Sequence, residues 1–335
     1  MKKVLLYGGL ALGGVVVLLV AGAGALYAST ADDYAVPATV DLDPGLPRIE
    51  VNGNLLHGER FGDPDNPTVL VLHGGPGGDY RSLLGLQELA DHYHVVFYDQ
   101  RGAGLSQRLP AEEITYQALL EDLDALVERF GDGRPVHLVG HSWGAMLASA
   151  YLGIAPEKVG KVVLAEPGYL DAAGYDAWQQ VYASLMSGPG YAWTALRAGF
   201  KAQHVRGPDT YAAEDYLVGE VILDYFTNHP DNPYHCPGEL YDAPKWRWGT
   251  TASNAVQASL TAADLDGMSA HAGEDAGPVL FLTGACNTWI GEEMQRSHAA
   301  RFADAAVQVI PDAGHDMFWD NPTESIAAVR AFLND

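Results

Sequence analysis

Cysteine and basic residues are both scarce in this chain. Only 2 of its 335 residues are cysteines, which excludes a fold held by several disulfides and a metal site built from several thiolates. Lysine and arginine together number 19 against 43 aspartates and glutamates, which gives a formal net charge of -24. A chain this acidic repels phosphate groups, so we expect no nucleic-acid partner. Hydrophobic residues make up 48% of the chain, enough for a sizeable core and too many for global disorder.

One long apolar run stands at the N-terminus. Lys2 and Lys3 precede the uncharged segment Val4–Ala28, which as a helix is long enough to span a bilayer. We expect residues 1–28 to be an uncleaved signal anchor, the only contact with a membrane, that places the rest of the chain outside the cytoplasm. The alternative is a cleaved signal peptide and a secreted or periplasmic protein. Residues 29–47, rich in proline and aspartate, are predicted to be a linker.

Short apolar runs alternate with helical patterns through most of the remaining sequence. Arg48–Val51 and Leu55–Glu59 flank Asn52-Gly53-Asn54, a sequence typical of a hairpin turn. Further buried strands are predicted at Val69–His73, Val95–Tyr98, Val136–Val139, Lys161–Ala165, Val279–Thr283 and Val307–Ile310. Helices are predicted at Leu83–His92, Thr115–Phe130, Ser142–Gly153 and Pro322–Leu333. This alternation predicts an α/β fold, in which helices cover both faces of a mostly parallel sheet.

The alternation stops between about residues 168 and 260. This stretch holds four of the seven tryptophans and nine of the 17 tyrosines, and its patterns are helical. An insertion between two parallel strands emerges at one edge of the sheet, where it can roof a site. We therefore predict a helical cap at residues 168–260, inserted between two parts of the core at residues 48–167 and 261–335.

The segment Gly140–Gly144 fits the motif G-x-S-x-G, with Ser142 at its centre. It directly follows the predicted strand Val136–Val139 and directly precedes a predicted helix, which is the setting of a nucleophile elbow. The N-terminus of that helix favours negative charge at the reacting oxygen. These features predict that Ser142 is a catalytic nucleophile.

Two further segments suit the same reaction. The glycine-rich segment His73–Gly78 ends a predicted strand, and glycines let backbone amides approach a substrate oxygen. We predict an oxyanion hole formed by the amides of Gly75 and Trp143. His315 follows the last predicted strand and comes late in the chain, in the order serine, acid, histidine that accompanies a nucleophile elbow. We predict that His315 is the general base.

These motifs make the sequence similar to α/β-hydrolases of the proline-iminopeptidase-like group. The resemblance covers about Arg48 to Asp335. It rests on HGGPGG at His73–Gly78, DQRGAGLS at Asp99–Ser106, GHSWG at Gly140–Gly144 and DAGHDMFWDNP at Asp312–Pro322. The resemblance implies a serine hydrolase that removes an N-terminal residue, often proline, from short peptides. It implies neither a metal nor an organic cofactor.

The sequence departs from the family pattern at the acid of the triad. Relatives carry an aspartate after the penultimate strand, in a segment like G-x-x-D, where this chain has Gly284–Asn287. An asparagine can orient an imidazole but cannot stabilise imidazolium with a negative charge. We predict that Glu166 replaces the aspartate, because it ends the predicted strand Lys161–Ala165 and some α/β-hydrolases place their acid there. Asn287 is then a supporting residue of the site.

The resemblance also implies that the cap recognises the substrate. In iminopeptidases, glutamates of the cap hold the free amino group of the substrate, and aromatic side chains line the pocket for its first residue. We predict this contact for Glu220, because it lies in the apolar stretch Leu217–Phe226, where a carboxylate needs a partner. Trp143 is predicted to contact the substrate as well. The other acids considered are Glu214, Asp215, Asp224 and Glu239.

The two cysteines lie in the predicted cap and beside the predicted triad loop. A disulfide between Cys236 and Cys286 would tie the cap to the core in an exported protein. The alternative is a reduced pair, with Cys286 lining the site. The sequence leaves both states open, because the distance between the two Cα atoms decides between them.

Three functions are compatible with these motifs. The first is an aminopeptidase that releases an N-terminal proline or another small residue through an acyl-enzyme on Ser142. The second is a carboxylesterase, lactonase or amide hydrolase that uses the same residues. The third is a non-catalytic binding protein with a decayed site, which Asn287 alone supports. The expected partner is a small-molecule or short-peptide substrate, and the sequence indicates no oligomeric state.

Overall fold

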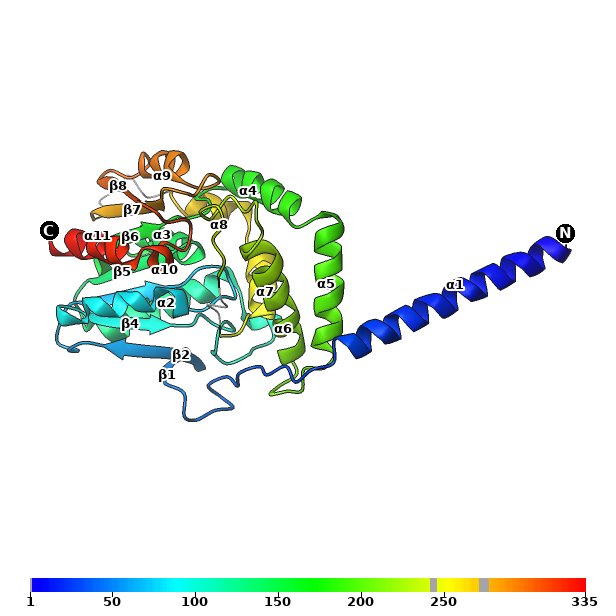
Figure 1. Cartoon of the computed structure of the whole chain (residues 1–335). Coiled ribbons are helices and arrows are strands. Elements are labelled where there is room, and N and C mark those ends of the chain that lie inside the picture. Colours follow the sequence, from blue (N-terminus) through cyan, green and yellow to red (C-terminus); the bar gives the residue numbers. More distant parts are fainter. Residues whose placement is uncertain (1, 242–245, 271–276) are drawn as a thin grey trace.

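The computed structural model describes residues 2–241, 246–270 and 277–335, and its centre is a single sheet (Figure 1). Within these residues eight strands pair in the order β1-β2-β4-β3-β5-β6-β7-β8. The strands are β1 (Arg48–Val51), β2 (Asn54–Phe61), β3 (Thr68–Leu72), β4 (His94–Tyr98), β5 (Val136–His141), β6 (Val159–Ala165), β7 (Val279–Gly284) and β8 (Ala305–Ile310). β1 pairs with β2, and β2 pairs with β4, in antiparallel orientation. All pairs among β3 to β8 are parallel. The predicted α/β fold with a mostly parallel sheet is confirmed.

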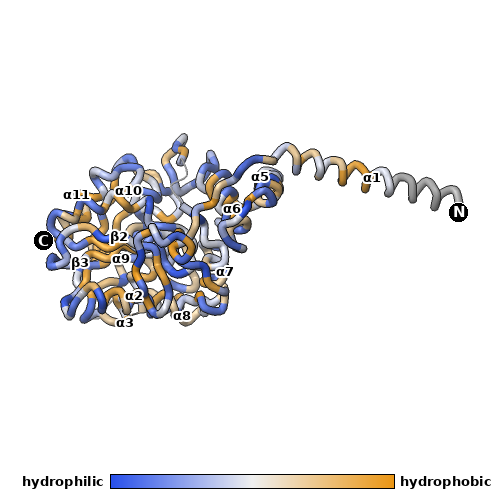
Figure 2. The backbone as a smooth tube through the Cα atoms, turned by 90° about the horizontal axis from the view of Figure 1, so that it is seen from below, coloured by the Kyte–Doolittle hydropathy of each residue, from blue (hydrophilic) through white to orange (hydrophobic). Residues whose placement is uncertain are grey.

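Helix α1 (Lys2–Ser29) contains the apolar run Val4–Ala28 and projects away from the rest of the chain (Figures 1 and 2). Among the described residues, no helix is both long and apolar enough to cross a membrane. The prediction of a signal anchor, on which the extracytoplasmic location depended, is therefore wrong. The prediction rested on the length of the uncharged run and on the two lysines that precede it.

β1 and β2 form the predicted hairpin at one edge of the sheet. Val51 pairs with Asn54, so that Asn52 and Gly53 are the two residues of the turn. Both have a positive φ, 48° and 80°, as a type I′ turn requires. Asparagine and glycine adopt this conformation at low cost, which explains why the short sequence signal was sufficient.

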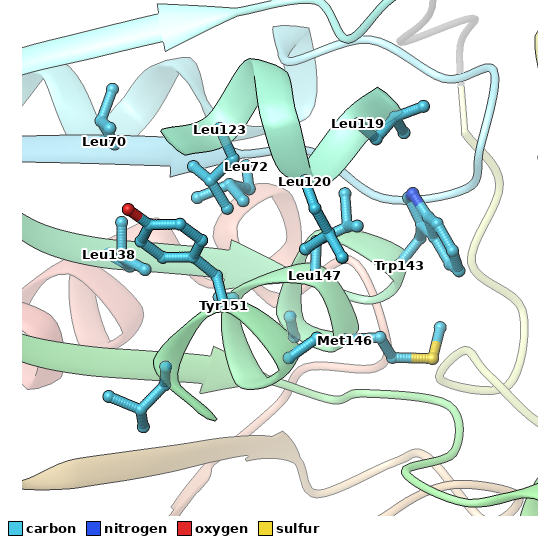
Figure 3. Packing of buried hydrophobic residues seen from close by; sticks show 14 of the residues in the cluster. Leu70, Leu72, Leu119, Leu120, Leu123, Leu138, Trp143, Met146, Leu147 and Tyr151 are labelled. Carbon is cyan, nitrogen blue, oxygen red and sulfur yellow. The ribbon is translucent and has the colours of Figure 1, made fainter. Parts of the chain in front are cut away.

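Alternate residues of the central strand β3 face two separate hydrophobic clusters. Leu70 and Leu72 belong to the cluster on one face, and Val69 and Val71 belong to the cluster on the other. Every residue of this strand is buried, as expected for a parallel strand covered on both sides. Figure 3 shows the first cluster, in which the leucines of β3 pack against helices α2 and α3. These helices are α2 (Tyr116–Gly131) and α3 (Trp143–Ile154).

The remaining helices of the core are η1 (Arg81–Asp91), η2 (Ala111–Glu113), η3 (Pro156–Lys158), α9 (Glu292–Ala299), α10 (Met317–Asp320) and α11 (Pro322–Asn334). The second hydrophobic cluster packs against η1, α10 and α11. η1 is a 3₁₀ helix that overlaps the helix predicted at Leu83–His92. Its buried residues Leu83, Leu86 and Leu89 are three positions apart, which matches the three residues per turn of a 3₁₀ helix.

The residues between β6 and β7 fold mainly into helices, which gather beyond one end of the sheet (Figure 1). These helices are α4 (Ala172–Leu185), α5 (Gly188–Ala202), α6 (Ala212–Val221), the π-helix η4 (Ile222–Thr227), α7 (Thr250–Ser259) and α8 (Ala262–Gly267). We use the name cap for residues 168–260. Arg108 of the core and Arg247 of the cap both donate to the buried carboxylate of Asp215, at 2.9 and 2.7 Å. The two charge-assisted contacts hold α6 against the core.

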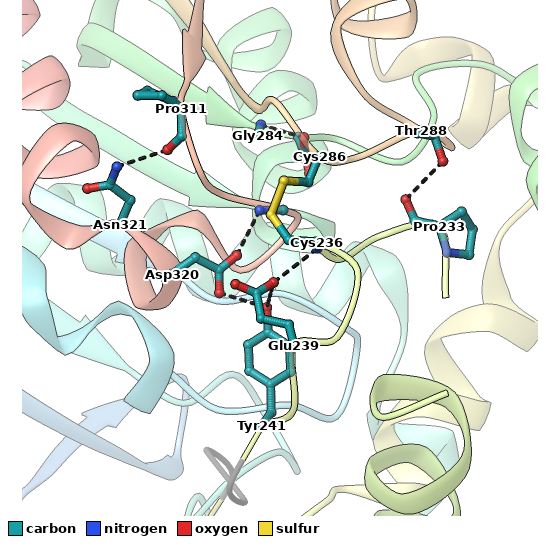
Figure 4. The surroundings of a disulfide bond; sticks show 12 residues. Pro233, Cys236, Glu239, Tyr241, Gly284, Cys286, Thr288, Pro311, Asp320 and Asn321 are labelled. Carbon is teal, nitrogen blue, oxygen red and sulfur yellow. Dashed lines mark hydrogen bonds between the residues drawn. A yellow bond between two sulfur atoms is a disulfide. The ribbon is translucent and has the colours of Figure 1, made fainter. Parts of the chain in front are cut away.

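A disulfide joins Cys236 of the cap to Cys286 in the loop after β7 (Figure 4). The two Cα atoms lie 4.9 Å apart, so of the two states that the sequence left open, the structure contains the bridged one. Beside the bridge, the backbone amide of Thr288 donates to the carbonyl of Pro233 at 2.9 Å. The cap segment from Pro233 to Cys236 and the loop from Cys286 to Thr288 therefore lie side by side.

Removing the disulfide is expected to lower stability strongly, because its cysteines are 50 residues apart in the sequence. The double variant Cys236→Ala/Cys286→Ala should lose about 4 kcal/mol of unfolding free energy, since a long closed loop restricts the unfolded chain. Denaturant unfolding of the oxidised wild type and of this variant measures the difference. The reduced wild type is the control for the cavity left by the substitutions. A loss below about 1 kcal/mol would contradict the prediction.

Candidate active site

Ser142 occupies the turn between β5 and α3. Its φ of 53° lies in the left-handed region, which is strained for a residue with a side chain. The two glycines of its motif permit this turn because neither position has room for a Cβ atom. A Cβ atom added to Gly140 would lie 2.4 Å from the carbonyl oxygen of Gly144, and one added to Gly144 would lie 2.1 Å from the carbonyl oxygen of Leu72. Strand, turn and helix can pack this closely only with glycine at both positions. The packing exposes Ser142 at the carboxyl edge of the sheet.

The glycine-rich loop His73–Gly78 lies against this turn. A Cβ atom added to Gly74 would lie 2.9 Å from the Cβ atom of Ser142. Gly75 has a φ of 51°, and Trp143 is the first residue of α3. Both residues line the same cavity as Ser142. Their backbone amides stay our prediction for the oxyanion hole.

Glu166 follows the last residue of β6 and is fully buried. Its carboxylate accepts hydrogen bonds from four donors, two at each oxygen. Oε1 accepts from the hydroxyl of Thr283 and the amide of Gly284, both at 2.8 Å. Oε2 accepts from Asn287 Nδ2 at 2.7 Å and lies 2.8 Å from Nδ1 of His315. The structure thus brings together Glu166, Asn287 and His315, which are far apart in the sequence.

The ionisation of Glu166 is set by burial and by its donors. Burial raises the pKa of Glu166 above its ordinary value, and the hydrogen bonds from Gly284, Thr283 and Asn287 oppose this rise. All four donors favour the charged form, which accepts hydrogen bonds at both oxygens. A carboxylate at Nδ1 of His315 keeps the proton on that nitrogen and leaves Nε2 as the nitrogen that can accept one.

Asn287 stands where the family pattern has an aspartate, and its amide is fixed in one orientation. The backbone amides of Trp289 and Ile290 both donate to its Oδ1 at 3.0 Å. Its Nδ2 therefore faces Glu166, to which it donates. An aspartate at this position would place a second negative charge against Glu166, so an amide at Asn287 is compatible with a carboxylate at Glu166.

His141, next to the serine, contacts the backbone and the ring of His315. Its Nε2 lies 2.8 Å from the carbonyl oxygen of His315, and the two ring centroids are 4.6 Å apart. Burial, followed by the proximity of His315, lowers the pKa of His141 to about 4. His141 is therefore neutral at neutral pH, and its Nε2 carries the proton that the carbonyl accepts. This contact places the loop of His315 directly beside Ser142.

Ser142 and His315 line one cavity of about 190 Å³ between the core and the cap. Seven of the described residues in its wall carry an aromatic ring of phenylalanine, tyrosine or tryptophan. The rings that line it are those of Trp143, Tyr169, Trp178, Tyr182, Phe226, Tyr234 and Trp248. Trp143, which we predicted to contact the substrate, is therefore in a position to do so. A cavity of this kind suits a compact apolar group next to the reacting carbonyl.

Glu220, the predicted contact for a substrate amine, does not appear among the described residues that line this cavity. It forms an ion pair with Lys201 of α5, which is the partner that its apolar surroundings demand. The carboxylates that do line the cavity, within the described residues, are Asp79 and Asp316. Asp79 directly follows the glycine-rich loop His73–Gly78, but no motif in the sequence indicated its place in the cavity.

Asp79 accepts hydrogen bonds from the backbone amides of Arg81 and Trp246, and thereby joins the glycine-rich loop to the cap. Burial and the nearby charge of Asp99 raise the pKa of Asp79 to about 7. The guanidinium of Arg81, which lies 3.9 Å from the Asp79 carboxylate, opposes this rise in pKa. A further cation bound beside Asp79 would oppose it as well. As for metals, no group of three or more histidine, cysteine or acidic side chains suited to a metal ion occurs in the part of the chain that the structure describes.

Comparisons with known proteins agree with the fold of this chain. The family model of the alpha/beta hydrolase fold matches residues 67–322. A proline iminopeptidase from Heyndrickxia coagulans is 39% identical over 126 residues, which are 36% of this chain and 42% of the relative. A proline iminopeptidase from Xylella fastidiosa strain Temecula1 is 34% identical over 131 residues, 38% of this chain and 41% of the relative. The matched region thus spans about two-fifths of these curated relatives.

Solved structures match over most of the chain. A proline iminopeptidase-related protein from Thermus thermophilus aligns with 86% of this chain and 96% of its own, at a TM-score of 0.56 and 24% identity. At this identity the likeness shows the fold alone. Since the family model covers most of the chain, from the glycine-rich loop to the loop of His315, the chain belongs to the alpha/beta hydrolase fold family, and its sequence is similar to proline iminopeptidases.

Proposed function

We propose that the chain is a serine hydrolase with Ser142 as the nucleophile, His315 as the general base and Glu166 as the acid of the triad. The observation that carries this proposal is the hydrogen bond between Nδ1 of His315 and the buried carboxylate of Glu166, at the sheet edge where Ser142 lies. A buried carboxylate behind an imidazole, with a serine in the same cavity, is the arrangement that activates a hydroxyl.

The reaction follows from the positions of these groups. His315 removes the proton of Ser142 through Nε2 while the serine oxygen attacks the substrate carbonyl, and Glu166 stabilises the imidazolium that forms. The amides of Gly75 and Trp143 bind the oxyanion of the tetrahedral intermediate. His315 then gives its proton to the leaving group, which departs and leaves an acyl-enzyme on Ser142. Water attacks the acyl group in the same way and releases the product.

For the substrate, we propose a short peptide from which an N-terminal proline or another small residue is released. The similarity to proline iminopeptidases and the compact aromatic cavity support this choice. The alternative is a carboxylesterase, lactonase or amide hydrolase, which the pairing of Glu220 with Lys201 supports, because Glu220 is then not directed at a substrate amine. A non-catalytic binding protein is disfavoured, because Glu166 provides the carboxylate that Asn287 lacks.

Exchanging the acid and the amide tests the triad. Glu166→Gln should lower kcat by about 10⁴, because the imidazolium then lacks its counter-charge. Asn287→Asp added to this variant restores a carboxylate beside His315, so the double variant should recover at least about tenfold of that loss. The measurement is kcat for a short acyl ester, with unfolding midpoints as the control for folding. More than about a tenth of the wild-type kcat in Glu166→Gln would sink the proposed triad.

A comparison of three substrates decides between peptidase and esterase. An aminopeptidase should cleave proline-naphthylamide and leave its N-blocked analogue intact, because the free amine contributes binding energy at the transition state. The third substrate is a short acyl ester, which reports the triad without an amine. Turnover of the ester together with no cleavage of either amide would favour the esterase. Labelling of Ser142 by a fluorophosphonate, absent in Ser142→Ala, confirms that the serine is reactive.

Two carboxylates of similar chemistry provide a matched pair for amine recognition. Asp79→Asn should raise KM for proline-naphthylamide about tenfold and leave KM for the ester unchanged, because Asp79 lines the cavity. Glu220→Gln should change neither KM, because Glu220 pairs with Lys201 outside the lining. Equal effects of Asp79→Asn on both substrates would show a structural role of Asp79. If Glu220→Gln raised KM for the amide and Asp79→Asn did not, the substrate amine would bind at Glu220 in the cap.

A further inference from the structure

We propose that Tyr234 of the cap is a positioning residue for His315, which holds the imidazole by its backbone and stabilises the imidazolium with the face of its ring. This inference rests on the proposed function, because it requires His315 to become protonated during the reaction. Neither the triad nor the resemblance to a known family pointed to Tyr234.

Tyr234 contacts His315 twice. Its carbonyl oxygen accepts a hydrogen bond from the backbone amide of His315 at 2.7 Å. Its ring stacks on the imidazole, with centroids 4.4 Å apart and an angle of 21° between the planes. The approach is so close that a Cβ atom on Gly314 would lie 2.4 Å from the carbonyl oxygen of Tyr234. One residue of the cap therefore fixes both the backbone and the ring plane of the proposed base.

Tyr234 is itself held on its other side. Its hydroxyl accepts a hydrogen bond from the indole nitrogen of Trp178 at 2.7 Å. Its ring stacks on Trp289 at 4.6 Å, Trp289 stacks on Trp178 at 5.4 Å, and Trp178 stacks on Tyr182 at 4.9 Å. Five stacked rings thus lead from helix α4 to His315. This ring stack consists of Tyr182, Trp178, Trp289, Tyr234 and His315.

The disulfide joins the two chain segments that carry the rings of Tyr234 and Trp289. Cys236 is two residues after Tyr234, and Cys286 is three residues before Trp289 (Figure 4). The residue that follows Cys286 is Asn287, which donates to Glu166. The paired segments around the bridge therefore deliver a ring to one side of the His315 imidazole and an amide to the carboxylate at its Nδ1. Because the bridge restrains both segments, Tyr234 is held in a fixed position, as a residue that orients His315 must be.

The face of the Tyr234 ring is a neutral surface that lies against His315, among groups of which some are charged. Glu166 is bonded to Nδ1 of His315, and Asp316 follows it in the chain. His141, packed on the same imidazole, is neutral at neutral pH because burial lowers its pKa to about 4. Burial also raises the pKa of the Tyr234 hydroxyl, so its ring carries no charge. A neutral aromatic face at this distance attracts a cation, and protonation of His315 creates one.

The test compares variants of the full, oxidised chain. Tyr234→Leu keeps an apolar side chain but removes the ring face, Tyr234→Phe keeps the ring but loses the bond from Trp178, and Tyr182→Leu removes the far end of the ring stack. For each, kcat and KM for a short acyl ester are measured across about pH 5 to 9. The acid limb of this profile reports the titration of the Glu166–His315 pair.

In Tyr234→Leu we expect kcat to fall about tenfold with KM nearly unchanged, and the acid limb to move down by about half to one pH unit. The shift is downward because the protonated imidazole loses its attraction to the ring. Tyr234→Phe should retain the acid limb of the wild type, and so should Tyr182→Leu. An acid limb of Tyr234→Leu that coincides with that of the wild type, with only the unfolding midpoint lowered, would overturn the proposal and leave Tyr234 a packing residue.

A second measurement is independent of turnover. The pKa of the His315 imidazole is titrated by NMR in the wild type and in Tyr234→Leu, and the same downward shift is expected. If the wild type neither hydrolyses the ester nor labels at Ser142, the proposed function fails while this titration still tests the contact. If the wild type is active and the pKa of His315 is the same in both proteins, the inference about Tyr234 fails alone.

Discussion

The buried carboxylate of Glu166 is the constraint on which the rest of the site depends. A carboxylate without solvent is costly unless donors surround it, and removing one donor leaves the charge uncompensated. Its donors come from the end of β7, the loop after β7 and the loop after β8, between 117 and 149 residues further along the chain. These segments meet only when the parallel sheet is complete, so the site cannot form ahead of the fold that carries it.

The cap both encloses the cavity and provides the ring that stacks on His315. It is fastened to the core by the carboxylate of Asp215, shared between Arg108 and Arg247, and by the disulfide. Between these two attachments it provides most of the aromatic wall of the cavity and the ring that stacks on His315. One fold can serve enzymes that differ in substrate, and in this chain the cap carries six of the seven aromatic residues that line the cavity. In the proposed reaction, substrate choice and the orientation of His315 would therefore depend on the same segment.

Local patterns predicted the parts of the structure that depend on local physics. The hairpin, the parallel strands and the turn at Ser142 follow from period, turn residues and glycine. Glu166 instead followed from the resemblance to the family, whose pattern has an aspartate where this chain has Asn287, together with its place at a strand end. Tyr234 could not be predicted, because its segment has no regular period and its contacts are with residues distant in the sequence. The contact of Glu220 with a substrate amine stays a prediction. The apolar stretch around Glu220 did not reveal that Lys201 of another helix is its partner, or that Glu220 is not among the described residues that line the cavity.

The disulfide also has a consequence for how the chain can be extended. It closes a loop of 50 residues that contains α7, α8 and the strand β7, which lies inside the sheet. At about 3.4 Å per residue, these residues correspond to on the order of 170 Å of extended chain. A force applied to the two termini cannot release this length while the bridge is intact. The strand that provides donors to Glu166 thus belongs to a segment that is mechanically shielded from tension along the chain.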